Sequence, residues 1–507
     1  TTGNYKLAFD TEGQNEVLKN KAYEIVAGDA SVKITAENTY KNYRDNDLAT
    51  IYNIVSFSGD NTIRADISLA NGSEISALGD VSITATASND PRNMVEYWGF
   101  NASEWTIANT FNSGVYAVRA DINVDGNIQG RTVEIAADSS ASFDNGDNKG
   151  RNLVTGLYDT VLKDKILAKT EKLEDTLDFF DAVGIHAVLT HTKAEVNIGA
   201  GSTINAYGDD GFELKDGKIK TDENGINEGG ALRITAVSSA EAKVEREIQN
   251  SAYDDAGKQK TNTSDIVNLV GVYGGATSEA KVTVEGTLET EGAAVVAAKS
   301  VADAGSNAAI SRPASVDKDP GQFSSSGNVN LSAAITRIDN NATVEFLTDS
   351  SLNAGGRVQL ASGVTDSIAV KAKVATDENA ILNIGAGLAL LESNNKVDIN
   401  GSIVGSEIDV SASETLEKSK ITINSSVGKD DPGIWKKVAD VEKKYNASKF
   451  MAYLTSPIET LITGYGDKEV KTYYDPDNIS RFGDVGTTFG LELGNVSSDV
   501  IIGANGS

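Results

Sequence analysis

The chain has no cysteine among its 507 residues. This absence excludes disulfides, thiol nucleophiles and cysteine-based zinc sites. A cytosolic chain of this length usually has a few cysteines, whereas a protein exported unfolded through an outer membrane benefits from having none, because a disulfide would block its passage. No secretory signal peptide or membrane-spanning run is recognisable in the sequence. The missing cysteines therefore favour an exported protein.

Positive charge is also scarce. There are 45 Lys and Arg residues against 73 Asp and Glu residues, which gives a formal net charge of −28. Phosphate contacts need a basic surface, so nucleic acid is not expected as a partner. The same charge disfavours adsorption to an anionic membrane, and we expect membrane contact only through parts absent from this segment. An acidic surface also discourages edge-to-edge pairing of a β-rich chain.

Short alternating runs are what the chain has in abundance. Residues 280–305, AKVTVEGTLETEGAAVVAAKSVADAG, contain three such runs, which begin at Ala280, Leu288 and Ala294. Each run is bounded by Gly or a small polar residue. The period of two predicts half-buried β-strands joined by tight turns, and no helical stripe fits it.

The same pattern recurs along the chain, where a Gly repeatedly precedes an aliphatic pair at positions i and i+2. The first residue that we expect to point inward in each copy is Val32, Val81, Val133, Leu232, Ala294, Val358 or Ile408. A single copy cannot bury its own apolar face, whereas a stack of copies can. The repeat therefore predicts an all-β fold, a parallel β-helix or β-solenoid, in which each strand pairs with its copy in the next coil.

The spacing of the copies gives an expected size. Upstream of most Gly-led strands stands a second motif, such as AEVNI or AKVTV, and before it an apolar run such as IVNLVGVYG. We interpret each unit of some 50 residues as two coils, and residues 1–507 as one solenoid segment of about 13 coils. At a strand spacing of ~4.8 Å this predicts a rod ~60 Å long.

Inserts interrupt the coils at about 37–50, 89–112, 145–181, 207–230, 250–265, 305–328 and 425–484. All six Pro, all three Trp and both Met lie in these inserts. Pro cannot donate to a strand ladder, and a narrow interior suits smaller side chains than Trp. Apart from 207–230, the inserts follow the Gly-led strand and precede the apolar run. We therefore expect them to project from one side of the solenoid.

Two inserts have the spacing of amphipathic helices. In 145–181, leucines and other apolar residues recur at helical intervals with opposed charges between them, and the first part of 425–484 is similar. We predict a helical insert at 145–181 and a partly helical one at 425–484.

The insert 207–230 is rich in Asp, Glu, Asn and Gly. Oxygen ligands on a flexible loop are what Ca²⁺ takes, which makes Asp209, Asp210, Asp222 and Glu223 candidate calcium ligands. The spacing of an EF-hand is absent, and so is the glycine-rich nonapeptide of calcium β-rolls. The alternative is a solvated hairpin without a metal, and no other cofactor is expected.

Large aromatic residues concentrate in two inserts. Tyr97, Trp98 and Trp105 lie in one of them, and Trp435 and Tyr453 lie in the other. Exposed aromatic side chains are common in contacts with proteins and sugars, so these residues are candidates for binding a partner. The alternative is that they pack the inserts onto the solenoid wall.

No motif indicates catalysis, since GxSxG, HExxH and P-loop sequences are absent. Asp121, Asp398 and Asp409 occupy strand positions, but they form no repeated pair with a nearby Arg or Lys of the kind that β-helix lyases and hydrolases need. The two histidines, His186 and His191, are five residues apart on one expected strand and should face opposite sides. We expect neither an enzyme nor a shared metal site at the histidines.

The succession of an apolar run, AxVxI, GxxIxA and GxVxIxA resembles the repeats of filamentous haemagglutinin-like exoproteins, and most of all the leukotoxin-type filamentous adhesins of double-membraned bacteria. It is seen in AVGIHAVLTHTKAEVNIGAGSTINAYG with ALRITAVSSAEAKV, and in the copies from Ile266 and Ile381. The resemblance implies a right-handed parallel β-helix, export by two-partner or autotransporter-type secretion, and a place on the outer cell surface.

The resemblance and the inserts together give the expected function. We expect the structural shaft of a secreted or cell-surface adhesin, which would support virulence by displaying inserts to a host or bacterial surface protein or glycan. Self-association into filaments or lateral arrays is a further expectation. The alternatives are the passenger of a secreted toxin or contact-dependent effector, and a carbohydrate-active β-helix enzyme. The chain opens outside a complete unit, so we expect it to be a segment of a longer protein.

Overall fold

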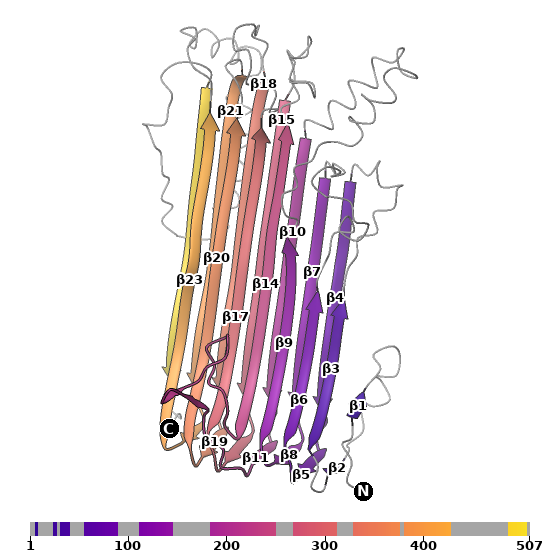
Figure 1. The fold of residues 1–507 in the computed structure, drawn as a ribbon, viewed down its shortest axis with the longest axis vertical. Coiled ribbons are helices and arrows are strands. Elements are labelled where there is room, and N and C mark those ends of the chain that lie inside the picture. The colour runs from indigo at the N-terminus through magenta and orange to yellow at the C-terminus, as the bar shows by residue number, and fades with distance from the viewer. Residues whose placement is uncertain are drawn as a thin grey trace.

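A computed structural model describes residues 6–8, 24–27, 31–40, 55–89, 111–144, 183–249, 267–311, 328–375, 380–426 and 485–503. These residues form strands and turns without a helix, so the described part of the chain is all-β as its alternating pattern predicts. The helices predicted at 145–181 and 425–484 lie outside the described residues. Three parallel sheets stack coil upon coil and make the fold a parallel β-helix (Figure 1).

Two sheets of long strands face each other. Sheet 1 consists, in spatial order, of β1 (Lys6–Ala8), β3 (Val32–Tyr40), β6 (Val81–Asn89), β9 (Val133–Asp144), β14 (Leu232–Gln249), β17 (Ala294–Ser311), β20 (Arg357–Ala375) and β23 (Glu407–Ser426). Sheet 2 consists of β4 (Val55–Leu69), β7 (Phe111–Val124), β10 (Val183–Ile198), β15 (Val267–Val284), β18 (Asn328–Phe346), β21 (Ala380–Ile399) and β24 (Val485–Ile502).

A third sheet of short strands joins the two long sheets. Sheet 3 consists of β2 (Glu24–Ala27), β5 (Glu74–Ala77), β8 (Asn127–Gly130), β11 (Thr203–Ala206), β16 (Thr287–Thr290), β19 (Ser351–Ala354) and β22 (Ser402–Val404). It lies at the bottom of Figure 1, which we call the closed end. The opposite end, where strands of sheet 1 finish and strands of sheet 2 begin, is the insert end.

Each coil runs down sheet 2, turns through sheet 3 and returns up sheet 1. In Figure 1 sheet 1 ascends in front, sheet 2 descends behind, and the stack advances from right to left, so the β-helix is right-handed. The stretch 280–305 is such a turn, because it contains the end of β15, all of β16 and the start of β17.

The interpretation of each unit as two coils is wrong. The apolar run and the AxVxI motif lie on one long strand, as IVNLVGVYG and AKVTV do on β15, so each unit is a single coil. The eight strands of sheet 1 extend ~34 Å along the axis at the usual strand spacing, while an 18-residue strand such as β15 spans ~60 Å across it. The solenoid is therefore shorter and broader than the predicted rod.

The register predicted from the Gly-led motif is confirmed. Each first inward residue pairs with its copy in the next coil, in the order Val32, Val81, Val133, Leu232, Ala294, Val358 and Ile408. All but the last are buried. Ile408 is 42% exposed because β23 is the outermost strand of sheet 1 among the described residues.

The core between sheets 1 and 2 has an apolar cluster toward each end. The cluster toward the closed end includes Val133 and Ile198, and the cluster toward the insert end includes Val188 and Val244. Between them lies a layer of fully buried hydroxyl and amide side chains, which we call the polar layer: Ser139, Ser238 and Ser300 from sheet 1, and Thr192, Ser278, Asn340 and Ser393 from sheet 2.

Hydrogen bonds across the interior satisfy much of this polar layer. Ser278 donates to Ser238 at 2.9 Å and accepts from Ser300 at 2.7 Å. Nearer the insert end, a buried amide ladder follows the axis, in which Asn268 donates to Asn330 at 2.7 Å and Asn330 donates to Asn383 at 2.8 Å. Stacking identical polar side chains in register lets each one bond to its copy, which removes the penalty of burying it alone.

Tight turns at the closed end require a left-handed backbone in some coils. Gly72 and Gly201 have φ values of 81° and 86° at equivalent positions between sheets 2 and 3, and Asp349 takes the same place with φ of 72°. The residue after each turn, such as Ser202, donates its backbone N–H back across the turn. Gly adopts this conformation without a steric penalty, and Asp tolerates it better than most residues.

Most predicted inserts begin and end at the insert end of the described strands. They connect the last residue of a sheet 1 strand to the first residue of a sheet 2 strand, as between Asn89 and Phe111 or between Ser426 and Val485. The insert predicted at 305–328 starts too early, because β17 continues to Ser311 and pairs with β20 as far as Ile310.

Candidate functional site

The insert 207–230 is the one insert that the structure describes throughout, and it departs from the closed end. It contains a hairpin of β12 (Leu214–Lys215) and β13 (Lys218–Ile219). In Figure 1 this hairpin crosses in front of sheet 1. Ile226 is buried against Val295 and Ala297 on the outer face of β17, and Phe212 packs against the same cluster. The insert is therefore attached to the wall rather than solvated on all sides.

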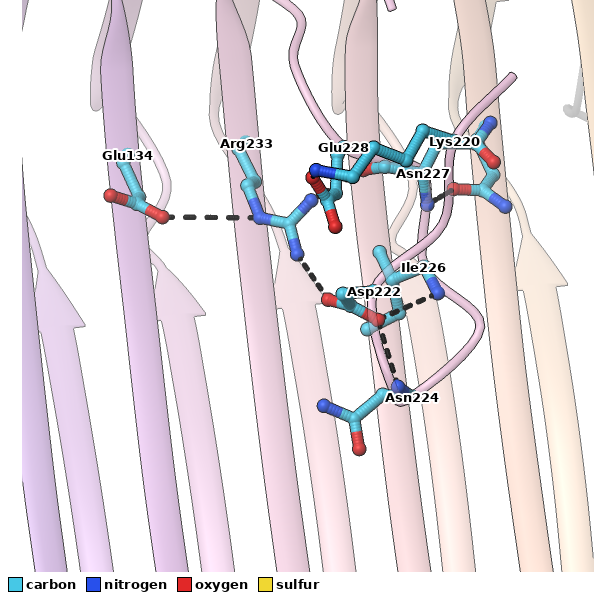
Figure 2. A network of polar contacts seen from close by, with 9 residues as sticks. Glu134, Lys220, Asp222, Asn224, Ile226, Asn227, Glu228 and Arg233 are labelled. Carbon is cyan, nitrogen blue, oxygen red and sulfur yellow. Dashed lines mark hydrogen bonds and ion pairs between the residues drawn. The ribbon is translucent and has the colours of Figure 1, made fainter. Parts of the chain in front are cut away.

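Polar contacts around Arg233 fasten the insert further (Figure 2). Arg233, on β14, donates to a carboxylate oxygen of Asp222 at 2.7 Å and to the backbone carbonyl of Asn227. The other Asp222 oxygen accepts the backbone N–H groups of Asn224 and Ile226 at 2.9 and 3.0 Å. Asp222 thus serves as the hub of the loop and binds it to the wall at the same time.

A second polar contact joins the insert to a different coil. The backbone N–H of Asn227 donates to Oε1 of Gln359 on β20 at 3.0 Å, and Figure 2 shows this bond beside the Arg233 network. Lys220 pairs with Glu228 and, at 3.4 Å, with Glu213 within the loop. The insert therefore spans β14, β17 and β20, and fixes its own shape.

The four predicted calcium ligands are not brought together. Asp210 forms an ion pair with Arg131 at 3.0 Å, and Asp222 is engaged by Arg233. Glu223 lies near Asp138 on β9, where loss of solvation and then the charge of Glu223 raise the pKa of Asp138. Over the described part of the chain, three or more Asp, Glu or His side chains nowhere gather in a way that holds a metal ion.

The aromatic residues predicted to bind a partner, Tyr97, Trp98, Trp105, Trp435 and Tyr453, lie outside the described residues. What the structure gives is the place where their inserts attach. One insert leaves β6 and enters β7, and the other leaves β23 and enters β24, so both attach at the insert end.

The outer face of sheet 2 carries paired charges. Lys193 contacts Glu195 at 3.0 Å and Glu279, on the next strand, at 3.2 Å. Burial opposes the ionisation of Glu195, but its bond to Lys193 and the charge of Lys193 outweigh it and lower the pKa of Glu195. On the same face Lys281 pairs with Glu345 at 3.1 Å. Ion pairs between neighbouring strands thus compensate opposite charges on the outer face of sheet 2.

Two of the strand carboxylates do have basic partners, contrary to the sequence-based expectation. Asp121 pairs with Arg119, and Asp398 pairs with Lys396. In each pair the two residues are two apart on one strand, so they share the outer face. Asp409 is exposed on β23. The histidines are placed as predicted, since His186 is buried in the interior and His191 faces outward.

An apolar cluster also lies on the outer face of sheet 2, toward the insert end. Leu388, Leu390 and Leu491 form it, with Ile335 and Leu493 packed against them. These side chains point away from the interior, because the alternate residue Ala389 belongs to the inner core. Leu491 is nevertheless only 2% exposed. The outer face of sheet 2 near the insert end is therefore apolar, and its side chains pack against one another.

The sequence analysis missed two carboxylates inside the solenoid. Asp366 on β20 is fully buried, and Glu414 on β23 points to the same interior because it pairs with the inward Val364. A signal was present in the sequence, since Asp366 follows the alternation of Val364 and Ile368, both of which are buried.

Comparison of the chain with protein-family models, curated proteins and solved structures gives no match. Among the described residues, no helix is long and apolar enough to span a membrane.

Proposed function

We propose that this chain is the structural shaft of a secreted or cell-surface bacterial filamentous adhesin, and that its inserts carry the binding function. The observation that carries the proposal is the in-register stacking of the coils with the strand-to-strand inserts attached at one end. A rigid ladder with loops on one edge positions those loops toward a common partner, and recognition residues concentrate on loops held by a rigid scaffold.

The sequence of the inserts supports a surface protein or glycan as the partner. The three Trp residues all lie in 89–112 and 425–484, and aromatic side chains supply much of the binding energy in such contacts. The net charge of −28 argues against nucleic acid. The proposal places the protein outside the cell and assigns it no catalytic role.

The structure also suggests how to remove an insert without breaking the shaft. Strand β20 ends at Ala375 and β21 begins at Ala380, so only residues 376–379 (Thr-Asp-Glu-Asn) join sheet 1 to sheet 2 in that coil. We expect the same four residues to replace 90–110 or 427–484 while both flanking strands stay paired. The replacement of 251–265, an insert that has no Trp, is the matched control.

The test is binding of the purified chain to epithelial and bacterial cells and to a glycan array. We expect the two Trp-insert replacements to lose at least ~10-fold in binding, with unchanged β-sheet circular dichroism, while the control keeps its binding. Equal binding by all variants, or killing of target cells by the intact chain, would overturn the adhesin proposal, and the second outcome would favour the toxin alternative.

A further inference from the structure

The polar layer changes character between β18 and β23, where carboxylates enter it. Asp366 points inward from β20 and is fully buried. Its register partner on β23 is Leu416, and Glu414 lies two residues earlier on the same inward face. The neighbouring strands of sheet 2 present Asn340 and Ser393, which are register partners and fully buried. Four polar side chains from four strands thus face one another.

Contacts confirm that these side chains converge. Asn340 Nδ2 donates to Asp366 Oδ1 at 2.7 Å across the interior. The Ser393 hydroxyl lies near both carboxyl groups and affects their pKa values, but it forms no well-directed hydrogen bond with either of them. Since Asn340 and Ser393 belong to sheet 2 and the carboxylates to sheet 1, the group bridges the two walls.

Several oxygen atoms of this group have no partner. Asn340 Oδ1, Asp366 Oδ2, Ser393 Oγ and Glu414 Oε2 are all buried and make no hydrogen bond. Elsewhere the polar layer is better satisfied, as Ser278 and Ser300 show. Unpaired buried carboxylate oxygens are costly, so a native structure that holds two of them in one place needs a proton, a water or a cation there.

Within the described part of the chain, no basic side chain neutralises the two carboxylates from inside. Lys299 is the cation whose charge acts on Asp366. It lies on the outer face of sheet 1, where its Nζ donates to Thr365 Oγ1 at 2.7 Å and passes over Gly363. The wall of the sheet therefore separates Lys299 from the unpaired oxygens, which point into the interior.

The donor set identifies the class of ligand. Two carboxylates, an amide carbonyl and a hydroxyl are hard oxygen donors with a combined charge of −2, which matches a divalent cation. Ca²⁺ accepts six to eight oxygens in an irregular arrangement, whereas Mg²⁺ demands near-octahedral geometry and retains its waters. Donors from four different strands suit the less regular ion. Glu414 is only partly buried, which leaves a path for the ion to enter.

We propose that Asp366, Glu414, Asn340 and Ser393 bind one Ca²⁺ inside the solenoid and so clamp sheet 1 to sheet 2. This site is separate from the acidic insert 207–230, and it does not depend on the adhesin proposal. The bound ion would join β18 and β21 of sheet 2 to β20 and β23 of sheet 1, and would stiffen that part of the shaft.

The test uses the full chain after removal of metals with a chelator. Calorimetric titration with CaCl₂ should show one saturable site, and MgCl₂ at the same concentration should not fill it. Asp366→Asn and Glu414→Gln should each weaken Ca²⁺ binding at least ~10-fold. Asp409→Asn removes one charge from an exposed position on β23, and it should leave the affinity unchanged. This control separates the site from loose binding to an acidic chain.

Thermal unfolding gives a second measurement that does not require calorimetry. At a hundredfold excess of free Ca²⁺ over Kd, the Tm of the native chain should rise by roughly 2–4 °C, and that of Asp366→Asn should not. If Asp366→Asn does not fold, Glu414→Gln, at a partly exposed position, serves in its place. An unchanged Tm of the native chain, or an equal rise in native chain and variant, would overturn the proposal.

Discussion

Thr192 of β10 and Ser238 of β14 join sheets 1 and 2 through a hydrogen bond of 2.7 Å between their hydroxyl oxygens. Ser238 also accepts from Ser139 at 3.2 Å and from Ser278 at 2.9 Å. It is thus the centre of the polar layer, with contacts to both neighbouring coils and to the opposite sheet. Because hydrogen bonds are directional, the polar layer fixes how sheets 1 and 2 are aligned with each other. Apolar packing of small side chains would fix this alignment less strictly.

Ser238→Ala is expected to lower the free energy of unfolding by about 1–3 kcal/mol, because the substitution removes one partner from several buried hydroxyl groups. The matched control is Ser239→Ala, one residue along on the outer face, which should change stability by less than about 0.5 kcal/mol. Urea unfolding followed by circular dichroism measures both. Equal effects of the two variants would show that the polar layer contributes little.

Val282→Asp is expected to prevent stable folding, because Val282 is fully buried and the new carboxylate would have no partner. Thr343→Asp introduces the same group on the outer face between Lys281 and Lys396, its register neighbours, and should be tolerated. Soluble yield and Tm compare the two. If Val282→Asp melts like the native chain, the inward register of β15 is wrong.

Arg233→Ala is expected to release the insert 207–230 while the solenoid stays folded. The substitution removes the ion pair to Asp222 and the bond to the Asn227 carbonyl. Trypsin should then cleave at Lys218 and Lys220 at least ~10-fold faster, because local unfolding exposes them. Lys281→Ala, which breaks an ion pair to Glu345 on the outer face of sheet 2 and away from the insert, is the control. No acceleration in Arg233→Ala would mean that Phe212 and Ile226 suffice to hold the insert.

Stability in the absence of metal is expected to depend on pH through Asp366 and Glu414. Burial raises the pKa of both groups above their ordinary values of 3.8 and 4.5, and the charge of Asp366 raises the pKa of Glu414 further. Asn340, Ser393 and Lys299 act in the opposite direction on the pKa of Asp366 but do not outweigh burial. The folded state therefore binds these protons more tightly than the unfolded state. The free energy of unfolding therefore increases as the pH falls from neutral through the raised pKa values. This gain is fully present once the pH is below the ordinary pKa values of the unfolded chain.

The measurement compares the Tm of the native chain and Asp366→Asn in chelator between pH 8 and pH 5. The variant should be the more stable at pH 8, where the native carboxylate is charged and buried, and its advantage should shrink toward pH 5. The other charge near Asp366 is Lys299, whose own pKa is lowered by burial despite the charges of Glu417 and Asp366. A difference between the two proteins that does not vary with pH contradicts the assignment.

Local sequence predicted the coil and its register because both depend on neighbours in the chain. Alternation fixes which face of a strand is buried, and a Gly-led turn fixes where the strand starts, so the seven residues from Val32 to Ile408 align as expected. The hairpin insert was recognisable from its composition. Its attachment through Phe212, Ile226 and Arg233 was not, because the partners on β17 and β20 are distant in sequence.

The length of the strands was decided by the tertiary structure. The segment Gly305–Ser311 has the residue types of a turn or an insert, and the sequence analysis ended the strand before it. In the fold Ser300 bonds to Ser278 of the facing sheet, and β17 continues to Ser311. A polar residue can lie inside only when a partner from another coil satisfies it. That is why the sequence alone determined the alternation, the turns and the register, whereas the polar layer, its carboxylates and the breadth of each coil emerged only when the two long sheets faced each other.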